Sequence, residues 1–236
     1  MIDLFKSKFE TKGYGILTNF LSQEEHDHYV SICDHILNHR HAKEYEWAYN
    51  PNGTICKMHG ACETVPAFHQ LASHPRLIYE ARRLLPFENE MDIYISKFFP
   101  MEPNATSTLM HQDNYYFNSD RSRVISCAVY LQDTTKENGC LRVVESSHKV
   151  GIFPHTLDHS DGMATWIDEN ELKDYKIIDL ELSAPYAVFF DINLVHGCYI
   201  NNSNSTRYSL AWEYINRNEK SLVDSADKWC DRTPII

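Results

Sequence analysis

Long apolar runs are absent from this sequence of 236 residues. No stretch approaches the roughly 18–20 consecutive apolar residues that a membrane-spanning helix requires. The opening MIDLFKSKFETKG also lacks the apolar core of a secretory signal. We therefore expect a cytoplasmic protein with no membrane partner.

Paired cysteine motifs are absent as well. The seven cysteines are odd in number, and none of them forms a Cys-x-x-Cys pair. This usage is typical of reduced thiols in an intracellular protein and argues against a disulfide framework.

Basic residues are scarce. The chain has 22 lysines and arginines against 33 aspartates and glutamates, which gives a formal net charge of −11. A surface of that sign repels the phosphates of nucleic acids and of anionic lipid headgroups. The charge therefore predicts no nucleic-acid partner, and the oligomeric state is left open.

Internal repeats, low-complexity tracts and breaks in composition are also missing. With 43% apolar residues, the chain is long enough for one well-buried domain. We expect a single domain over residues 1–236, in which residues 1–90 form a mainly helical support. Residues 91–215 form the β-rich core, and residues 216–236 form a polar tail.

Helical signals dominate the N-terminal third. Ser22 and Glu25 form a capping box, and apolar residues recur behind it at helical spacing. A strand is expected over residues 13–20, before this helix. Two further helical pieces are expected within residues 65–85, with a break at His74-Pro75.

From Met91 onward, the sequence pattern becomes typical of β-strands. Branched and aromatic residues fill segments 92–99, 124–131, 177–182, 186–190 and 208–214, and clusters of Asn, Gly, Asp and Pro separate them. Many short strands of this kind predict a sandwich or a barrel. Residues 156–175 are acidic and predict a surface excursion; whether this segment is a lid is not indicated.

Three short motifs carry the chemistry: His111-Gln112-Asp113, then His196-Gly197, then Arg207 with Ser209. On an extended backbone, alternate side chains point the same way, so we expect His111 and Asp113 to share a face. A later histidine can complete a set of two histidines and one carboxylate. That set suits Fe(II) because it leaves positions open for a co-substrate and dioxygen.

Each motif also has a structural interpretation. A second His-x-Asp, His159-Ser160-Asp161, shows how easily the pattern arises; we discount it because its surroundings are turn-like. His196 alone could be a core histidine bonded to a backbone carbonyl. Arg207 alone could be a strand-end arginine in water, but with Ser209 on the same face it suits the far carboxylate of 2-oxoglutarate.

Together these segments resemble the phytanoyl-CoA dioxygenase family of Fe(II)- and 2-oxoglutarate-dependent oxygenases. The resemblance covers residues 91–215, and the opening segment GYGILTNFLSQEE shows a weaker similarity to the start of the family pattern. It rests on His111-Gln112-Asp113, on LQD with ENGCL and SSHK over residues 131–149, and on VFFD with His196-Gly197 and Arg207. It implies a mainly β fold with flanking helices, a double-stranded β-helix of the jelly-roll or cupin-like type.

The resemblance also implies roles for individual residues. His111, Asp113 and His196 would bind Fe(II) and form the catalytic centre, and Arg207 would bind 2-oxoglutarate. Lys97 matches a strand position where some members contact this co-substrate, and its alternative interpretation is a surface lysine. The family often has His-Gly-Ser, but Cys198 stands in that place here, so Ser209 is expected to substitute.

Asp113 also separates two kinds of chemistry. Related halogenases replace this carboxylate with a small residue, which opens a position for chloride. An aspartate here favours hydroxylation, with dioxygen consumed and succinate and CO2 released.

The substrate pocket is not inherited from the resemblance. No cluster of Lys and Arg lies in residues 40–64 or 149–175, so the phosphates of CoA are a poor electrostatic match. We expect a small free metabolite, such as an amino acid, a betaine-like compound or a phosphonate. Candidate contacts are Trp47, Lys57, His59, Tyr115 and Tyr116, although tyrosines in such a place are more often core or rim aromatics than substrate contacts.

Two other classes of function stay open from the sequence. A cupin-like isomerase or hydrolase could use the same three ligands with another metal, but it would not need Arg207 and Ser209. A non-catalytic jelly-roll binding protein would have no use for the complete ligand set.

Overall fold

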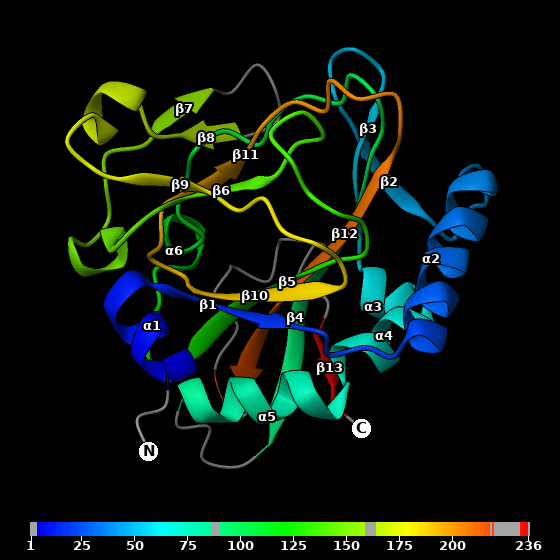
Figure 1. Cartoon of the computed structure of the whole chain (residues 1–236), viewed down its shortest axis with the longest axis horizontal. Helices are drawn as coiled ribbons and strands as arrows, with labels where there is room; N and C mark the ends of the chain where they lie inside the picture. The colour runs from blue at the N-terminus through cyan, green and yellow to red at the C-terminus, as the bar shows by residue number, and fades with distance from the viewer. Residues whose placement is uncertain (1–3, 86–89, 159–163, 218, 220–231, 236) are drawn as a thin grey trace.

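The computed structural model describes residues 4–85, 90–158, 164–217, 219 and 232–235. Its centre is a large antiparallel sheet with the strand order β1-β10-β5-β12-β4-β3-β2, to which β13 adds by pairing with β4. A small sheet, β11-β6-β9, lies opposite the large one, and β7 pairs with β8 beside it (Figure 1). This is the predicted mainly β fold of the double-stranded β-helix type.

The strands of the large sheet have these bounds: β1 Tyr14–Thr18, β2 Glu46–Tyr49, β3 Ile55–His59, β4 Met91–Met101, β5 Val124–Tyr130, β10 Tyr186–Asp191, β12 Arg207–Asn216 and β13 Arg232–Pro234. The other strands are β6 Leu141–Val144, β7 Thr156–Asp158, β8 Ala164–Trp166, β9 Ile177–Asp179 and β11 His196–Cys198. The five predicted β segments therefore correspond to β4, β5, β9, β10 and β12.

Helices cover one face of the large sheet. They are α1 Leu4–Lys12, α2 Gln23–Asn38, α3 Ala61–Thr64, α4 Pro66–Ala72 and α5 Pro75–Leu84 (Figure 1). Side chains from alternate positions of the strands, such as Cys127 and Leu210, pack with helix residues in one core. The intervening positions point to the other face, toward the small sheet, where Tyr130, Tyr186 and Val143 pack together.

Several local signals act as the sequence predicts. The Ser22 hydroxyl accepts a hydrogen bond from the Glu25 amide at 3.2 Å, and the Ser22 amide donates to the Glu25 carboxylate at 2.7 Å. Together they form the capping box at the start of α2. The strand β1 and the break between α4 and α5 are also where the sequence places them.

The N-terminal region holds two strands that the sequence does not indicate. β2 and β3 form a hairpin, and β3 pairs with β4 through Met58–Phe98 and His59–Lys97. Neither segment alternates clearly between apolar and polar residues, so its pairing comes from the edge of β4 and not from local preference. The division into residues 1–90, 91–215 and 216–236 stays a prediction.

The two polar segments also contain short strands. The segment 156–175 holds β7, β8 and the 3-10 turn Glu169–Leu172. In the tail, β13 pairs with β4, and Arg232 Nε donates to Asp92 Oδ2 at 2.7 Å. The discounted pair His159 and Asp161 lies outside the described residues.

Two expectations from composition can be compared with the described residues. Among them, no helix combines the length and apolar character needed to cross a membrane. The six described cysteines are free thiols, in keeping with the predicted absence of a disulfide framework.

Candidate metal centre

The two histidines of the motifs lie side by side because their backbones pair. The His111 amide donates to the His196 carbonyl, the His196 amide donates to the His111 carbonyl, and both hydrogen bonds measure 2.9 Å. This antiparallel bridge joins the end of the 107–111 segment to the start of β11. It brings the two imidazole centroids to 4.4 Å from each other.

Backbone carbonyls orient both imidazoles. His111 Nδ1 donates to the Leu109 carbonyl at 2.8 Å, and His196 Nδ1 donates to the Leu194 carbonyl at 3.0 Å. A carbonyl oxygen only accepts, so the proton of each neutral ring sits on Nδ1 and the lone pair on Nε2. Both histidines therefore present a ligating nitrogen to the same point, as metal-bound histidines do.

Asp113 completes the group, but not by the expected strand alternation. Its backbone is helical, with φ −58° and ψ −37°, and it caps the short helix α6 Asn114–Phe117. That prediction of an extended His-x-Asp is wrong because the chain turns into a helix immediately after Gln112. Asp113 Oδ1 nevertheless lies 3.7 Å from His111 Nε2 and 3.8 Å from His196 Nε2.

The two oxygens of Asp113 have different surroundings. Ser126 Oγ, from β5, donates to Oδ2 at 2.7 Å, while Oδ1 faces the two imidazoles. The hydroxyl thus fixes the carboxylate and leaves Oδ1 as the ligand atom. Sequence reasoning missed Ser126, although a lone hydroxyl residue among apolar neighbours in a buried strand was a signal for it.

The side chain of Gln112, between the two motif residues, anchors the turn. This residue is fully buried. Its Nε2 donates to the carbonyls of Gly151 at 2.8 Å and Asn193 at 2.6 Å. Its Oε1 accepts from the Phe153 amide at 2.8 Å. Gln112 therefore ties the ligand-bearing turn to two other loops, a role that sequence reasoning did not assign.

Gly197 is needed for the close approach of β11 to the 107–110 segment. A Cβ at this position would lie 2.6 Å from the Thr108 carbonyl oxygen and 3.0 Å from Met110 Sδ. No side chain fits in that space without movement. Glycine thus lets the strand that carries His196 lie against the segment that holds His111.

The three side chains suit a divalent transition metal. One ligand atom from each residue lies within 4.8 Å of the other two. Burial lowers the pKa of His196 to about 4, against the opposing charge of Asp113, which keeps this ring neutral and able to ligate. Burial alone would raise the pKa of Asp113. The charges of His196, His111 and Lys97 and a hydrogen bond from His111 outweigh burial, and they lower this pKa well below its usual range. Two neutral imidazoles and a carboxylate are the donor set of non-haem Fe(II) sites.

Arg207 lies buried on β12. Its Nη1 donates to Ser209 Oγ at 2.9 Å and its Nε to the Asn138 carbonyl at 3.2 Å. The guanidinium carbon sits 5.1 Å from the centre of the Tyr130 ring. Among the described residues, no carboxylate forms an ion pair with Arg207, so this buried cation suits an acidic ligand.

Lys97 lies on the same face of the large sheet, in β4. Its ammonium lies 3.3 Å from Glu213 Oε1, and the Glu213 side chain is only 3% exposed. Lys97 is also among the charges that act on Asp113 and His196. The interpretation of Lys97 as a surface lysine is therefore wrong, while its contact with a co-substrate stays a prediction.

The candidate substrate contacts on the hairpin divide between two faces. Trp47 pairs with Met58 and contacts Phe98, so it packs on the helix-covered face. We correct its assignment, because strand alternation turns this side chain away from the metal centre. Lys57 and His59 alternate with Met58 and lie on the other face, the face of Lys97.

The two tyrosines of α6 also differ. Tyr116 contacts the His111 ring edge-on, with a centroid distance of 6.5 Å, and its hydroxyl bonds to Thr165 Oγ1. Tyr115 stacks on His155 at 4.1 Å. Tyr116 is thus the one next to a metal ligand.

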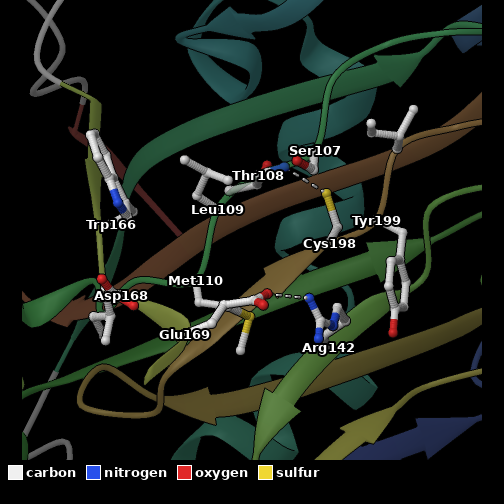
Figure 2. Close-up of a pocket in the computed structure, with 12 residues that line it drawn as sticks. Ser107, Thr108, Leu109, Met110, Arg142, Trp166, Asp168, Glu169, Cys198 and Tyr199 are labelled. Atoms are coloured by element: carbon white, nitrogen blue, oxygen red, sulfur yellow. Dashed lines mark hydrogen bonds and ion pairs between the residues drawn. The ribbon is translucent and has the colours of Figure 1, made fainter. Parts of the chain in front are cut away.

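A cavity of about 450 Å³ lies beside the 107–110 segment and Cys198 of β11 (Figure 2). The 107–110 segment, Trp166 and Tyr199 line it, and Arg142 pairs with Glu169 at 3.5 Å across it. Arg142 is paired with Gly197 in the sheet, so it lies on the face of β11 opposite His196. None of the three ligand side chains lines this cavity.

Comparison with known proteins gives one family. The family model described as "Phytanoyl-CoA dioxygenase (PhyH)" matches residues 9–209. A probable phytanoyl-CoA dioxygenase of Caenorhabditis elegans is 31% identical over 112 residues, 45% of this chain and 36% of that protein. The human peroxisomal phytanoyl-CoA dioxygenase is 27% identical over 110 residues, 44% of this chain and 32% of that protein. The matches span 36%, 42% and 37% of the length of the first three curated relatives.

Solved structures share the fold. EctD from S. alaskensis, with 2-oxoglutarate and 5-hydroxyectoine, superposes with a TM-score of 0.77 at 21% identity, over 94% of this chain and 80% of that one. The epimerase SnoN, in complex with Fe3+ and alpha ketoglutarate, gives 0.72 at 19% identity, over 90% and 82%. The carbocyclase SnoK gives 0.74 at 21% identity, over 92% and 84%.

Proposed function

The chain belongs to the phytanoyl-CoA dioxygenase family, and from that premise we propose that it is an Fe(II)- and 2-oxoglutarate-dependent oxygenase acting on a small free metabolite. Its iron ligands are His111, Asp113 and His196. Its co-substrate is anchored by Arg207 and Ser209, with Lys97 as a further contact.

One observation carries this proposal. Two side chains from one segment, His111 and Asp113, converge with His196 of β11 so that their ligand atoms lie within 4.8 Å of one another. Each is oriented by a hydrogen bond to its other polar atom. Such second hydrogen bonds are what fix metal ligands before the metal arrives. Three protein ligands would leave coordination positions open on Fe(II) for the co-substrate and dioxygen.

Arg207 gives the site its preference for a dicarboxylate. Its fork of N–H donors matches a carboxylate in a way that a lysine does not, and Ser209 lies on the same strand face to add a hydroxyl. The ring of Tyr130 closes one side of this position. A cupin-like isomerase or hydrolase would have no need of this arrangement.

The protein supplies orientation and a shielded setting for the reaction. When bound, Fe(II) with 2-oxoglutarate and dioxygen supplies an oxidant strong enough to break a C–H bond, with release of succinate and CO2. His111 and His196 would hold the metal through Nε2 and Asp113 through Oδ1, and Arg207 would hold the far end of the co-substrate. Substrate binds on the same face of the large sheet.

We propose hydroxylation as the outcome. Asp113 occupies the position that a halide would need, which disfavours halogenation. Two of the similar folds belong to an epimerase and a carbocyclase, so the product must be identified directly. A product that gains one oxygen atom supports hydroxylation, whereas an isomer or a ring-closed product would correct it.

A small free metabolite is the proposed substrate: an amino acid, a betaine-like compound or a phosphonate. The net charge of −11 and the lack of basic clusters argue against the phosphates of an acyl-CoA. A panel of acyl-CoA thioesters beside free amino acids, betaines and phosphonates tests this point. Succinate release with an acyl-CoA, and with nothing small, would overturn it.

A further inference from the structure

The carboxyl end of α2 carries two histidines whose rings face each other. His35 lies in the last turn of the helix and His39 is its C-cap residue. This spacing of four residues places side chains on the same face of a helix. The ring centroids lie 4.2 Å apart, with an angle of 32° between the ring planes. Both residues are exposed, so an ion in solution can reach the pair.

A hydrogen bond fixes the His39 ring as metal-binding histidines are fixed. Its Nδ1 donates to the His35 carbonyl at 2.8 Å, so the lone pair of the neutral ring is on Nε2. His111 and His196 show the same arrangement, with ring centroids 4.4 Å apart and each Nδ1 bonded to a carbonyl. Two metal–nitrogen bonds of about 2.0–2.1 Å join nitrogens that lie roughly 3 Å apart. The rings of His35 and His39 therefore need only a small rotation to share one ion.

The surroundings of this pair favour a cation. The aligned peptide dipoles of α2 place a partial negative charge at its carboxyl end. The adjacent basic residue, Arg40, is engaged elsewhere: its Nη1 donates to Glu102 Oε1 at 2.7 Å, and its Nε donates to the Leu37 carbonyl at 3.1 Å. The net charge of −11 adds a long-range attraction for positive ions.

We infer that His35 and His39 form a second metal site, which binds Ni(II), Cu(II) or Zn(II) at the surface of α2. Imidazole nitrogens suit these ions, and Ni(II) and Cu(II) bind such donors more tightly than Fe(II) does. Figure 1 shows α2 at the edge of the molecule, well apart from β11, which carries His196. The second site is thus separate from the candidate metal centre, and the inference does not depend on the proposed function.

Calorimetric titration of untagged protein with Ni(II) under nitrogen tests the inference. In the wild-type protein, we expect two kinds of Ni(II) site, the buried centre and the surface pair. His35→Ala and His39→Ala each leave a single imidazole on α2. Each should weaken binding at the surface site on the order of 100-fold, because two ligands on one rigid helix act at a high effective concentration. Binding at the buried centre should not change.

His28→Ala is the matched control. It removes another exposed histidine of α2, whose ring contacts Tyr29 and not a second histidine, and it should bind Ni(II) as the wild type does. Retention on immobilised Ni(II) gives an independent measurement, because the buried centre cannot reach the resin. The wild type and His28→Ala should need more imidazole for elution than His35→Ala and His39→Ala.

Three results would overturn the inference. They are unchanged Ni(II) affinity in both His35→Ala and His39→Ala, a loss in only one of these two variants, or an equal loss in His28→Ala. Failure of the candidate metal centre would look different. In that case the wild-type protein would show one Ni(II) site, and His35→Ala would remove it.

Discussion

At the scale of single residues, each ligand side chain is oriented by a hydrogen bond to the polar atom that does not face the metal. His111 and His196 each donate from Nδ1 to a carbonyl two residues earlier, and Asp113 accepts from Ser126. These bonds decide which atom faces the metal. The ligands themselves were predictable from their order in the sequence, but the bonds that orient them depend on tertiary contacts.

The metal ligands give the first prediction. His111→Ala, Asp113→Ala and His196→Ala should each abolish activity and strongly weaken Fe(II) binding, because a set of three protein ligands has no spare. His159→Ala and Asp161→Ala serve as controls and should behave as wild type in an anaerobic Fe(II) titration. Retained affinity in the His196 variant would show that the wrong histidine is assigned.

The co-substrate anchor gives the second prediction. Arg207→Lys replaces a planar fork with a point charge, so 2-oxoglutarate affinity should fall by roughly 10- to 150-fold. Fe(II) affinity should change little, since Arg207 is not a ligand. Titration with 2-oxoglutarate under nitrogen measures both, and an unchanged co-substrate dependence would contradict the assigned role.

Ser126 gives the third prediction. Ser126→Ala removes the hydrogen bond to Asp113 Oδ2 and leaves the fold of β5 intact, so metal affinity should fall roughly 10- to 100-fold. Ser122→Ala, which removes a hydroxyl that donates to the exposed Asp120, is the control. Equal Fe(II) affinities for the two variants would mean that the Ser126 bond does not position the carboxylate.

At the scale of secondary structure, the strands and helices position the site residues, and the sequence predicted some of these elements but not others. The long strands β4, β5, β10 and β12 were predictable because their apolar runs are bounded by turn residues, and α2 because of its capping box. β11 was not, since three residues carry no periodicity and the strand forms through its pairing with β6 and its bridge to His111. The helical turn at Asp113 was missed because the following Asn114–Phe117 segment is only four residues long.

The junction of β11 with the 107–110 segment gives the fourth prediction. Gly197→Ala places a methyl group 2.6 Å from the Thr108 carbonyl, so the two segments must separate. We expect a loss of about 1–3 kcal/mol in the free energy of unfolding, typical of overpacking, together with weaker Fe(II) binding.

Gly53→Ala is the matched control for this prediction. Its added methyl group meets nothing within 4 Å, although its φ of 81° brings backbone strain. It should lower stability without changing Fe(II) affinity. If Gly197→Ala behaves in the same way, the close approach does not position the ligands.

At the scale of the whole molecule, a chain with an acidic net charge places three basic side chains on one face of the large sheet. Lys57, Lys97 and Arg207 lie on the inner face of the large sheet, while the chain as a whole carries a net charge of −11. The global charge gives no indication of this interior arrangement. Only the register of β3, β4 and β12 shows that these cations share a face.

The most direct test of the account is succinate release by anaerobically purified protein reconstituted with Fe(II), 2-oxoglutarate and the small-metabolite panel, then exposed to dioxygen. The account predicts succinate in amounts matching an oxygenated product, dependent on Fe(II) and absent in Asp113→Ala. With chloride present, only the oxygenated product should form. Turnover with zinc or manganese in place of iron, and without 2-oxoglutarate, would instead identify another kind of metal enzyme. Binding of a metabolite without turnover would identify a non-catalytic protein. Either result would contradict the account.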